Sequence, residues 1–106
     1  MATYCFDLDG TLCFTSGSDY SNSTPKLKRI AKVNELASNG HKVIIFTARG
    51  ASSGLDWTEI TKKQLREWGV IHDELILGKP AADYYIDDKA IKDEDFFRVQ
   101  SESERF

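Results

Sequence analysis

The stretch that decides the fold of this chain is Thr3-Tyr4-Cys5-Phe6-Asp7-Leu8-Asp9-Gly10-Thr11. Its first four residues are mostly β-branched or aromatic and predict a buried strand. Side chains alternate along a strand, so Asp7 and Asp9 point the same way at its end. Gly10 then lets the backbone turn sharply out of the sheet. The strand therefore presents two carboxylates at a tight turn, the usual place of a functional site in an α/β sheet.

The two acids admit two interpretations. One carboxylate can attack an electrophilic phosphorus atom while the other moves a proton to and from the ester oxygens. Two anions this close repel each other, so a divalent cation is their natural companion. Alternatively, Asp and Gly are common turn residues, and the motif marks only the exit of a strand. The other motifs of the chain are needed to choose between these readings.

Length and composition fit one compact domain. The chain has 106 residues, 41% of them hydrophobic, which is enough for a single core. We expect residues 1–99 to form this domain and residues 100–106 to be a flexible tail. The net charge of −3 provides no basic surface for nucleic acid or an anionic membrane. No apolar run approaches the ~20 residues of a membrane span, and no secretory signal is visible, so we expect a cytoplasmic protein.

The cysteines and histidines do not form a metal-binding pattern. Cys5 and Cys13 are the only cysteines, and their spacing matches no common zinc motif. Because Cys5 belongs to the expected buried strand, we interpret both as reduced structural thiols. His41 and His72 each fall beside a turn that precedes a strand, which favours turn or surface positions over a catalytic role.

The first helix is expected directly after a polar loop over residues 12–24. Thr24 is a suitable N-cap and Pro25 a suitable first helical residue. The helix is apolar on one face, and Asn39 and Gly40 end it.

The second helix is expected to follow a loop at residues 48–56 that is rich in Gly, Ser and Ala. Asp56 can cap this helix and Gly69 ends it. Its stripe consists of Trp57, Ile60, Gln64, Leu65 and Trp68. This spacing predicts that both tryptophans pack in the core.

Strands alternate with these helices. The expected strands are 3–6, 42–47, 74–77 and 84–86, followed by helical turns within 89–96 and an edge strand at 97–99. The second of them is apolar throughout, as in strands buried on both faces. Alternating strands and helices predict right-handed crossovers and one parallel sheet, in a three-layer Rossmann-like α/β fold.

Polar side chains follow all four expected strands. They are Asp7 and Asp9 after the first, Thr47 at the end of the second, Lys79 after the third, and Asp87 and Asp88 after the fourth. The carboxyl ends of parallel strands share one sheet edge, so these side chains can converge. A hydroxyl and an ammonium bind phosphoryl oxygens, acids hold magnesium, and one acid attacks.

In these motifs the chain resembles the haloacid dehalogenase (HAD) superfamily of aspartate-based phosphohydrolases. The matching segments, in the family's order, are Asp7-Leu8-Asp9-Gly10-Thr11, Ile45-Phe46-Thr47, Lys79-Pro80 and Tyr85-Ile86-Asp87-Asp88. The resemblance covers roughly residues 3 to 96. Two further segments, 46–50 and 78–83, look like a small subgroup associated with bacterial capsule and surface-polysaccharide synthesis.

The resemblance implies a role for each matching residue. Asp7 is the nucleophile that forms an aspartyl-phosphate. Asp9 is the general acid on the leaving oxygen and then the general base for water, and its backbone carbonyl binds magnesium. Thr47 donates a hydrogen bond to the transferring phosphoryl group. Lys79 neutralises that group and keeps Asp7 ionised.

The remaining parts of the site are less sharply defined. The resemblance implies that Mg²⁺ is bound by Asp7, Asp9 and Asp87, with Asp88 binding it directly or through water. Arg49 is either a substrate-binding residue at the edge of the site or a surface arginine. The loop 50–56 is either a substrate gate or a flexible connection. An acid at position 9 favours phosphomonoester hydrolysis or phosphoryl transfer over pump or dehalogenase chemistry.

Neither gap between the motifs can hold the cap domain of larger members of this superfamily. The site should therefore be open unless a neighbouring subunit covers it, which favours a homodimer or homotetramer. An open site also suits a bulky or macromolecular substrate.

Three other functions compete with a metabolite phosphatase. A response-regulator receiver has its phosphorylated Asp after a later strand, so the order of motifs argues against it. Two alternatives stay open. One is a catalytically idle HAD-like regulatory or binding subunit. The other is a nucleic-acid or nucleotide phosphatase, although the acidic net charge argues against this second alternative. The sequence favours a magnesium-dependent phosphomonoester hydrolase acting on a small sugar phosphate or related metabolite.

Overall fold

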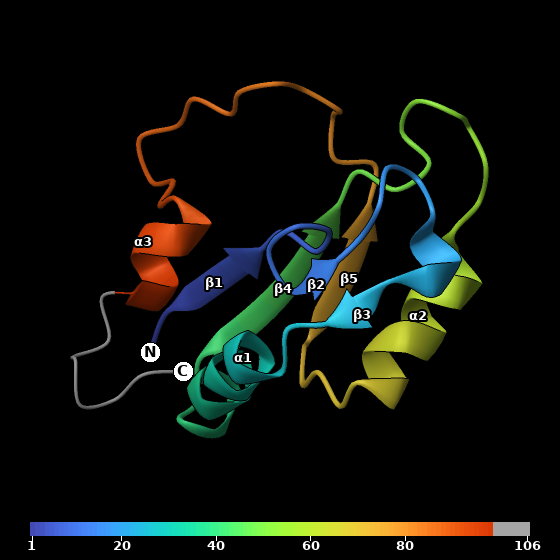
Figure 1. Ribbon diagram of the computed structural model, residues 1–106. Coiled ribbons are helices and arrows are strands. Elements are labelled where there is room, and N and C mark those ends of the chain that lie inside the picture. Colours follow the sequence, from blue (N-terminus) through green and yellow to red (C-terminus); the bar gives the residue numbers. More distant parts are fainter. Residues whose placement is uncertain (99–106) are drawn as a thin grey trace.

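The structure is a computed structural model that describes residues 1–98 of the chain (Figure 1). Its elements are β1 (Thr3–Phe6), β2 (Cys13–Phe14), the 3₁₀ turn η1 (Tyr20–Asn22), β3 (Thr24–Pro25), α1 (Leu27–Ser38), β4 (Lys42–Thr47), α2 (Thr58–Glu67), β5 (Glu74–Leu77) and α3 (Asp93–Arg98). The expected tail at 100–106 lies outside the described residues. None of the helices in residues 1–98 is long and apolar enough to cross a membrane.

The main sheet is parallel and runs in the order β1-β4-β5, with β4 in the middle (Figure 1). β1 pairs with β4 from Thr3↔Lys42 to Phe6↔Ile45, and β4 pairs with β5 up to Thr47↔Leu77. The expected α/β fold with a parallel sheet and no cap is confirmed. Because the strands are parallel, the carboxyl ends of β1, β4 and β5 share one edge of the sheet.

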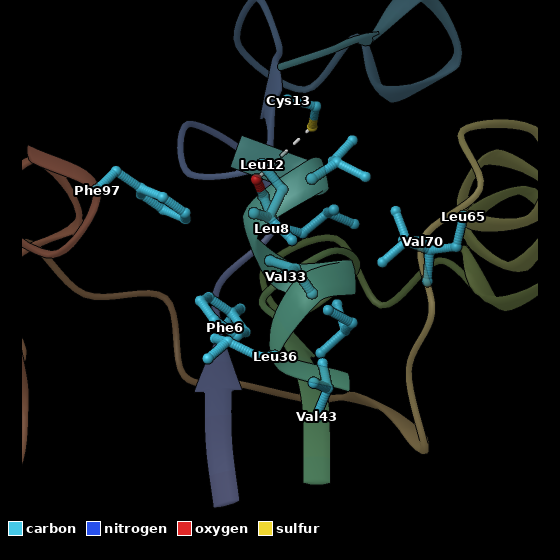
Figure 2. Close-up of a cluster of buried hydrophobic side chains, with 12 residues drawn as sticks. Phe6, Leu8, Leu12, Cys13, Val33, Leu36, Val43, Leu65, Val70 and Phe97 are labelled. Atoms are coloured by element: carbon cyan, nitrogen blue, oxygen red, sulfur yellow. Dashed lines mark hydrogen bonds between the residues drawn. The ribbon is translucent and has the colours of Figure 1, made fainter. Parts of the chain in front are cut away.

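One face of the sheet carries the core, in which α1 and α2 pack against the strands (Figure 2). Buried side chains come from β1, from the turn after it that carries Asp7 and Asp9 (residues 7–12, the acid turn), and from α1, α2, β4 and α3. They are Phe6, Leu8, Leu12, Ile30, Val33, Leu36, Val43, Ile45, Leu65 and Phe97. Burying one such side chain stabilises the fold by about 1.5–3 kcal/mol relative to leaving it in water. Leu8 and Leu12 bracket Asp9 and Gly10, so the core itself anchors the acid turn.

The other face of the sheet is only partly covered. Within β4, Ile44 and Phe46 are half-buried, whereas Val43, Ile45 and Thr47 are fully buried. Cys5 is exposed, and Ile76 is 40% exposed. The expectations that β4 is buried on both faces and that Cys5 is buried are therefore wrong for this structure.

The expected start of the first helix is wrong by about two residues. Thr24 and Pro25 form β3, which pairs antiparallel with β2, and the backbone N–H of Lys26 donates to Leu12 O at 2.9 Å. This pairing holds the segment extended, so α1 begins only at Leu27. The N-cap of α2 is Trp57 and not the expected Asp56, although Asp56 Oδ1 accepts the backbone N–H of Thr58, the first residue of the helix, at 2.9 Å.

The expected fourth strand at 84–86 does not form, and residues 78–92 contain neither helix nor strand. Tyr85 instead folds back on its own loop: its hydroxyl donates to Pro80 O, and its ring centroid lies 4.3 Å from Lys79 Nζ. Ile86 is 98% exposed. A strand of three residues makes few ladder hydrogen bonds, so local contacts such as those of Tyr85 can outweigh strand pairing.

The C-terminal elements also differ from expectation. The last helix, α3, is Asp93–Arg98, later than the turns expected within 89–96, and it occupies most of the expected edge strand. Its Phe96 and Phe97 pack on the β1 side chain Phe6, with ring centroids 5.6 and 6.2 Å away. Aromatic packing therefore holds α3 against β1.

Candidate active site

Asp7 lies at the end of β1 between two donors. Lys79 Nζ is 3.4 Å from Asp7 Oδ1, and Thr11 Oγ1 donates to Asp7 Oδ2 at 2.9 Å. The backbone N–H of Lys79 donates to Thr47 O at 3.1 Å, which ties the loop after β5 to the end of β4. The structure thus brings Asp7 and Lys79 together across the sheet edge, with the Asp7 side chain 35% exposed. A carboxylate beside an ammonium at an accessible edge can bind and attack a phosphoryl group.

Thr47 ends β4 at the same edge. It is fully buried, and its hydroxyl oxygen accepts the backbone N–H of Arg49 at 3.2 Å. This contact shapes the turn after β4. The hydrogen bond from Thr47 to a phosphoryl group stays a prediction, because the hydroxyl is covered in this arrangement.

Arg49 is buried and faces Asp9. Its side chain donates from Nε to Asp9 Oδ2 at 3.0 Å and from Nη2 to Asp9 Oδ1 at 2.8 Å. Nη1 donates to Thr61 Oγ1 at 3.1 Å and to Gln64 Oε1 at 2.6 Å. With Arg49 only 2% exposed, the interpretation as a surface arginine is wrong. Its donors serve protein acceptors here, and binding of substrate by Arg49 stays a prediction.

Asp9 is held as a carboxylate. Burial raises the pKa of Asp9, but hydrogen bonds from Arg49 and Thr15, together with the positive charge of Arg49, outweigh burial and lower that pKa below its usual range. Thr15 Oγ1 donates to Asp9 Oδ1 at 2.6 Å, and Cys13 Sγ lies 3.5 Å from the same oxygen. The ion pair with Arg49 therefore favours the ionised form of Asp9, and the base role expected of it stays a prediction.

Four polar residues of this network were missed at the level of sequence: Thr15, Ser23, Thr61 and Gln64. One signal was available for Gln64, a polar side chain within the otherwise apolar stripe of α2. Gln64 Nε2 also donates to Tyr20 O at 2.6 Å, which fastens the loop before β3 to α2. The other three gave no comparable signal, because Ser and Thr are common in loops and at helix starts.

Asp87 and Asp88 are not brought to the other acids. Both lie in the exposed loop 78–92, where Asp87 Oδ1 accepts the backbone N–H of Lys89 at 2.9 Å and Asp88 pairs with Lys89 Nζ at 3.6 Å. The backbone N–H of Lys89 lowers the pKa of Asp87, helped by Asp88.

The carboxylates expected to bind magnesium are not gathered at one point in this arrangement. Mg²⁺ needs near-octahedral oxygen ligands. The Asp9 carboxylate accepts hydrogen bonds from Arg49, and Asp7 pairs with Lys79 and accepts a hydrogen bond from Thr11. Among residues 1–98 no three His, Cys, Asp or Glu side chains lie close enough to hold a metal ion. The metal roles of Asp87 and Asp88 therefore stay predictions.

The fold and the acid turn agree with a comparison of the sequence with protein families. The family model for haloacid dehalogenase-like hydrolases matches residues 4–72, from β1 to the residues after α2. The chain belongs to this family of hydrolases.

One solved structure is similar to this chain in both sequence and fold. A crystal structure of a protein from Vibrio cholerae is 32% identical, with a TM-score of 0.82 over 91% of this chain and 87% of that one. No curated protein matches the sequence. Nothing in the comparisons supports the narrower likeness to the capsule and surface-polysaccharide subgroup.

Two structures of a Pnkp1/Rnl/Hen1 complex, one titled an RNA repair complex, match with a TM-score of 0.59 each. They are 24% and 21% identical over 93% and 99% of this chain, and the likeness shows the fold alone. The match covers 34% and 33% of those longer chains.

Proposed function

We propose that this protein is a phosphomonoester hydrolase in which Asp7 is the nucleophile. The observation that carries the proposal is the placement of Asp7 at the end of β1, with Lys79 Nζ 3.4 Å from Oδ1 and Thr11 on Oδ2. Lys79 offers positive charge to a phosphoryl oxygen at the point where Asp7 attacks. Membership of the hydrolase family supports the same chemistry.

The reaction has two steps. A carboxylate oxygen of Asp7 attacks phosphorus, the bond from phosphorus to the ester oxygen breaks, and the departing alcohol takes a proton from Asp9. Water then attacks the phosphorus of the aspartyl-phosphate, Asp9 takes a proton from that water, and free Asp7 and inorganic phosphate result. The Arg49 pair favours the ionised Asp9 of the second step, so the first step requires Asp9 to gain a proton.

The proposed substrate is a small sugar phosphate or related metabolite, and Mg²⁺ is the proposed cofactor. Hydrolases of this family generally use Mg²⁺, which supports the cofactor, although the donors above do not form its site. The experiment is hydrolysis by the purified protein of a panel of phosphate esters, with Mg²⁺ or with a chelator. We expect turnover with Mg²⁺ that the chelator removes.

Two variants test the nucleophile within the same panel. Asp7→Asn should abolish turnover, because an amide cannot form the aspartyl-phosphate. Glu67→Gln, which removes an exposed carboxylate at the end of α2, is the matched control. Full activity of Asp7→Asn would refute the assignment. A wild-type protein that hydrolyses no ester would favour the idle regulatory or binding subunit.

A nucleic-acid or nucleotide phosphatase is the second candidate. It is supported by the shared fold with the Pnkp1/Rnl/Hen1 RNA repair complex, and the net charge of −3 argues against it. Nucleotides and 3′-phosphorylated oligonucleotides therefore belong in the ester panel. The homodimer or homotetramer expected from the missing cap stays a prediction, which light scattering of the purified protein checks.

A further inference from the structure

The loop that joins β4 to α2 lines two hollows. The larger has a volume of about 390 Å³ and includes Ser18, Tyr20, Ala48, Ser52, Trp57 and Ala81 in its lining. The smaller has a volume of about 290 Å³ and includes Arg49, Leu77 and Gly78. Gly50, Leu55 and Trp57 line both hollows, so the two adjoin.

The larger hollow is lined by residues that are close along the chain to those of the proposed phosphoryl site. Its lining residue Ala48 directly follows Thr47, and Ala81 lies two residues after Lys79. Both positions belong to the sheet edge at which Lys79 reaches Asp7. Ligands of open α/β sheets bind in the crevice outside the carboxyl ends of the strands, which is where this hollow lies. A phosphate held at Asp7 would therefore have its leaving group at or near the hollow.

The aromatic wall of this hollow is held in place before any ligand arrives. The rings of Tyr20 and Trp57 meet edge to face, with centroids 4.9 Å apart and an interplanar angle of 81°. The Arg49 guanidinium lies 4.8 Å from the centroid of the Tyr20 ring, and Gln64 holds the Tyr20 carbonyl. A rigid aromatic surface loses little conformational entropy when a ring stacks against it.

The lining also restricts the charge and size of the occupant. It carries no charged side chain, and it offers serine hydroxyls from Ser18, Ser52 and Ser53 beside the two rings. Nucleic-acid strands are bound by positively charged grooves, so a neutral lining disfavours them. Small-molecule pockets measure roughly 300–1,000 Å³, which gives a hollow of about 390 Å³ room for a small ring but not for an oligomer.

We infer that the larger hollow binds the leaving group of the substrate, and that this group is a neutral, hydroxylated ring. The ring packs in the corner between the Tyr20 and Trp57 side chains, and its hydroxyls pair with the serines. A sugar fits this description, and so does the ribose of a nucleoside. The inference rests on the proposed phosphatase function for the position of the phosphate, but the hollow can be tested without turnover.

The kinetic test compares glucose 6-phosphate with ethyl phosphate, which lacks the ring. In Trp57→Ala the KM for glucose 6-phosphate should rise about tenfold relative to that for ethyl phosphate, equivalent to about 1.4 kcal/mol, because the sugar ring loses its contact with the indole. Ala81→Leu should act the same way by filling the hollow from an exposed loop. Trp68→Phe, the control, should change neither KM. An equal rise for both substrates in Trp57→Ala and Ala81→Leu would overturn the inference.

The binding test needs no phosphatase activity. In Trp68→Phe, Trp57 is the only tryptophan, so its emission reports on binding at the two adjoining hollows that it lines. Glucose and adenosine, both without phosphate, are titrated separately. A saturable change with glucose assigns a sugar, and a change with adenosine alone assigns a nucleoside. No change with either overturns the inference even if the protein hydrolyses phosphate esters, whereas a protein without turnover that binds glucose would refute only the proposed function.

Discussion

The Arg49 guanidinium and the Asp9 carboxylate form a two-point ion pair, with Nε–Oδ2 and Nη2–Oδ1 distances of 3.0 and 2.8 Å. The Arg49 side chain is fully buried and that of Asp9 is 23% exposed. The two residues are 40 positions apart, so this pair joins the acid turn after β1 to the turn after β4. Thr61 and Gln64 extend the connection into α2.

Arg49→Met should destabilise the protein by up to about 3–5 kcal/mol, because the partly buried Asp9 loses its charged partner and Thr61 and Gln64 lose a donor. Arg49→Lys should recover only part of this loss, since a lysine cannot make the two-point contact. Chemical denaturation measures both. Arg66→Met, at an exposed position of α2, is the matched control. Equal stability of Arg49→Met and the control would show that the pair contributes little.

Lys79→Met should lower kcat by about 10²–10³-fold, the usual cost of losing one electrostatic partner of a transition state. The fold should persist, because the Lys79 side chain remains partly accessible at the sheet edge. Steady-state kinetics with p-nitrophenyl phosphate measure the change, and Lys89→Met, in the same loop and 86% exposed, is the control. A Lys79→Met enzyme with the kcat of the wild type would remove Lys79 from the proposed mechanism.

Leu8→Ala should destabilise the protein by about 2–5 kcal/mol, since it opens a cavity beneath the acid turn. Leu8 is 0% exposed, whereas Leu27, at the start of α1, is 66% exposed and serves as the control at which Ala should cost little. Urea denaturation compares the two variants. The prediction fails if the two substitutions have similar effects.

The Arg29–Asp93 pair should make part of the stability depend on pH. Burial raises the pKa of Asp93, but hydrogen bonds and charge from Arg29, 2.7 Å away, and from Lys92 outweigh burial and lower that pKa. A carboxylate with a lowered folded-state pKa stabilises the fold above its unfolded pKa of about 3.9, and this stabilisation disappears as pH falls through the folded value.

The measurement for this pair is the difference in unfolding free energy between the wild type and Asp93→Asn at several pH values. The wild type should be the more stable at pH 7, and the difference should shrink below about pH 4, where the unfolded carboxyl begins to bind protons. A difference that stays constant down to pH 2 would contradict the assignment to this ion pair.

Much of the fold follows from local signals. The alternation of side chains in β1 and the left-handed Gly10, with φ of +85°, place Asp7 and Asp9 at one turn. The strand-helix order predicts the parallel sheet, and the sheet brings Lys79 to Asp7. These features depend on steric effects between near neighbours and on the spacing of hydrophobic residues. Both can be read from a single sequence.

The buried position of Arg49 was not predictable in the same way. Its partners Asp9, Thr61 and Gln64 come from three other parts of the chain. A charged side chain is buried only when enough acceptors surround it, and that condition depends on how the elements pack. The segment 84–86 shows the opposite case, since its strand-like residues form no strand and stay exposed.

The amino-acid sequence by itself determined the parallel α/β class, the acid turn and the order in which Asp7, Thr47 and Lys79 arrive at the sheet edge. Only the tertiary structure decided that Arg49 binds Asp9, that Asp87 and Asp88 stand apart from that pair, and that Tyr20 and Trp57 wall a hollow beside it. The physical reason is that the secondary-structure propensity of a residue depends on only a few neighbours along the chain. Charge burial and ring packing depend on segments that meet only once the chain has folded.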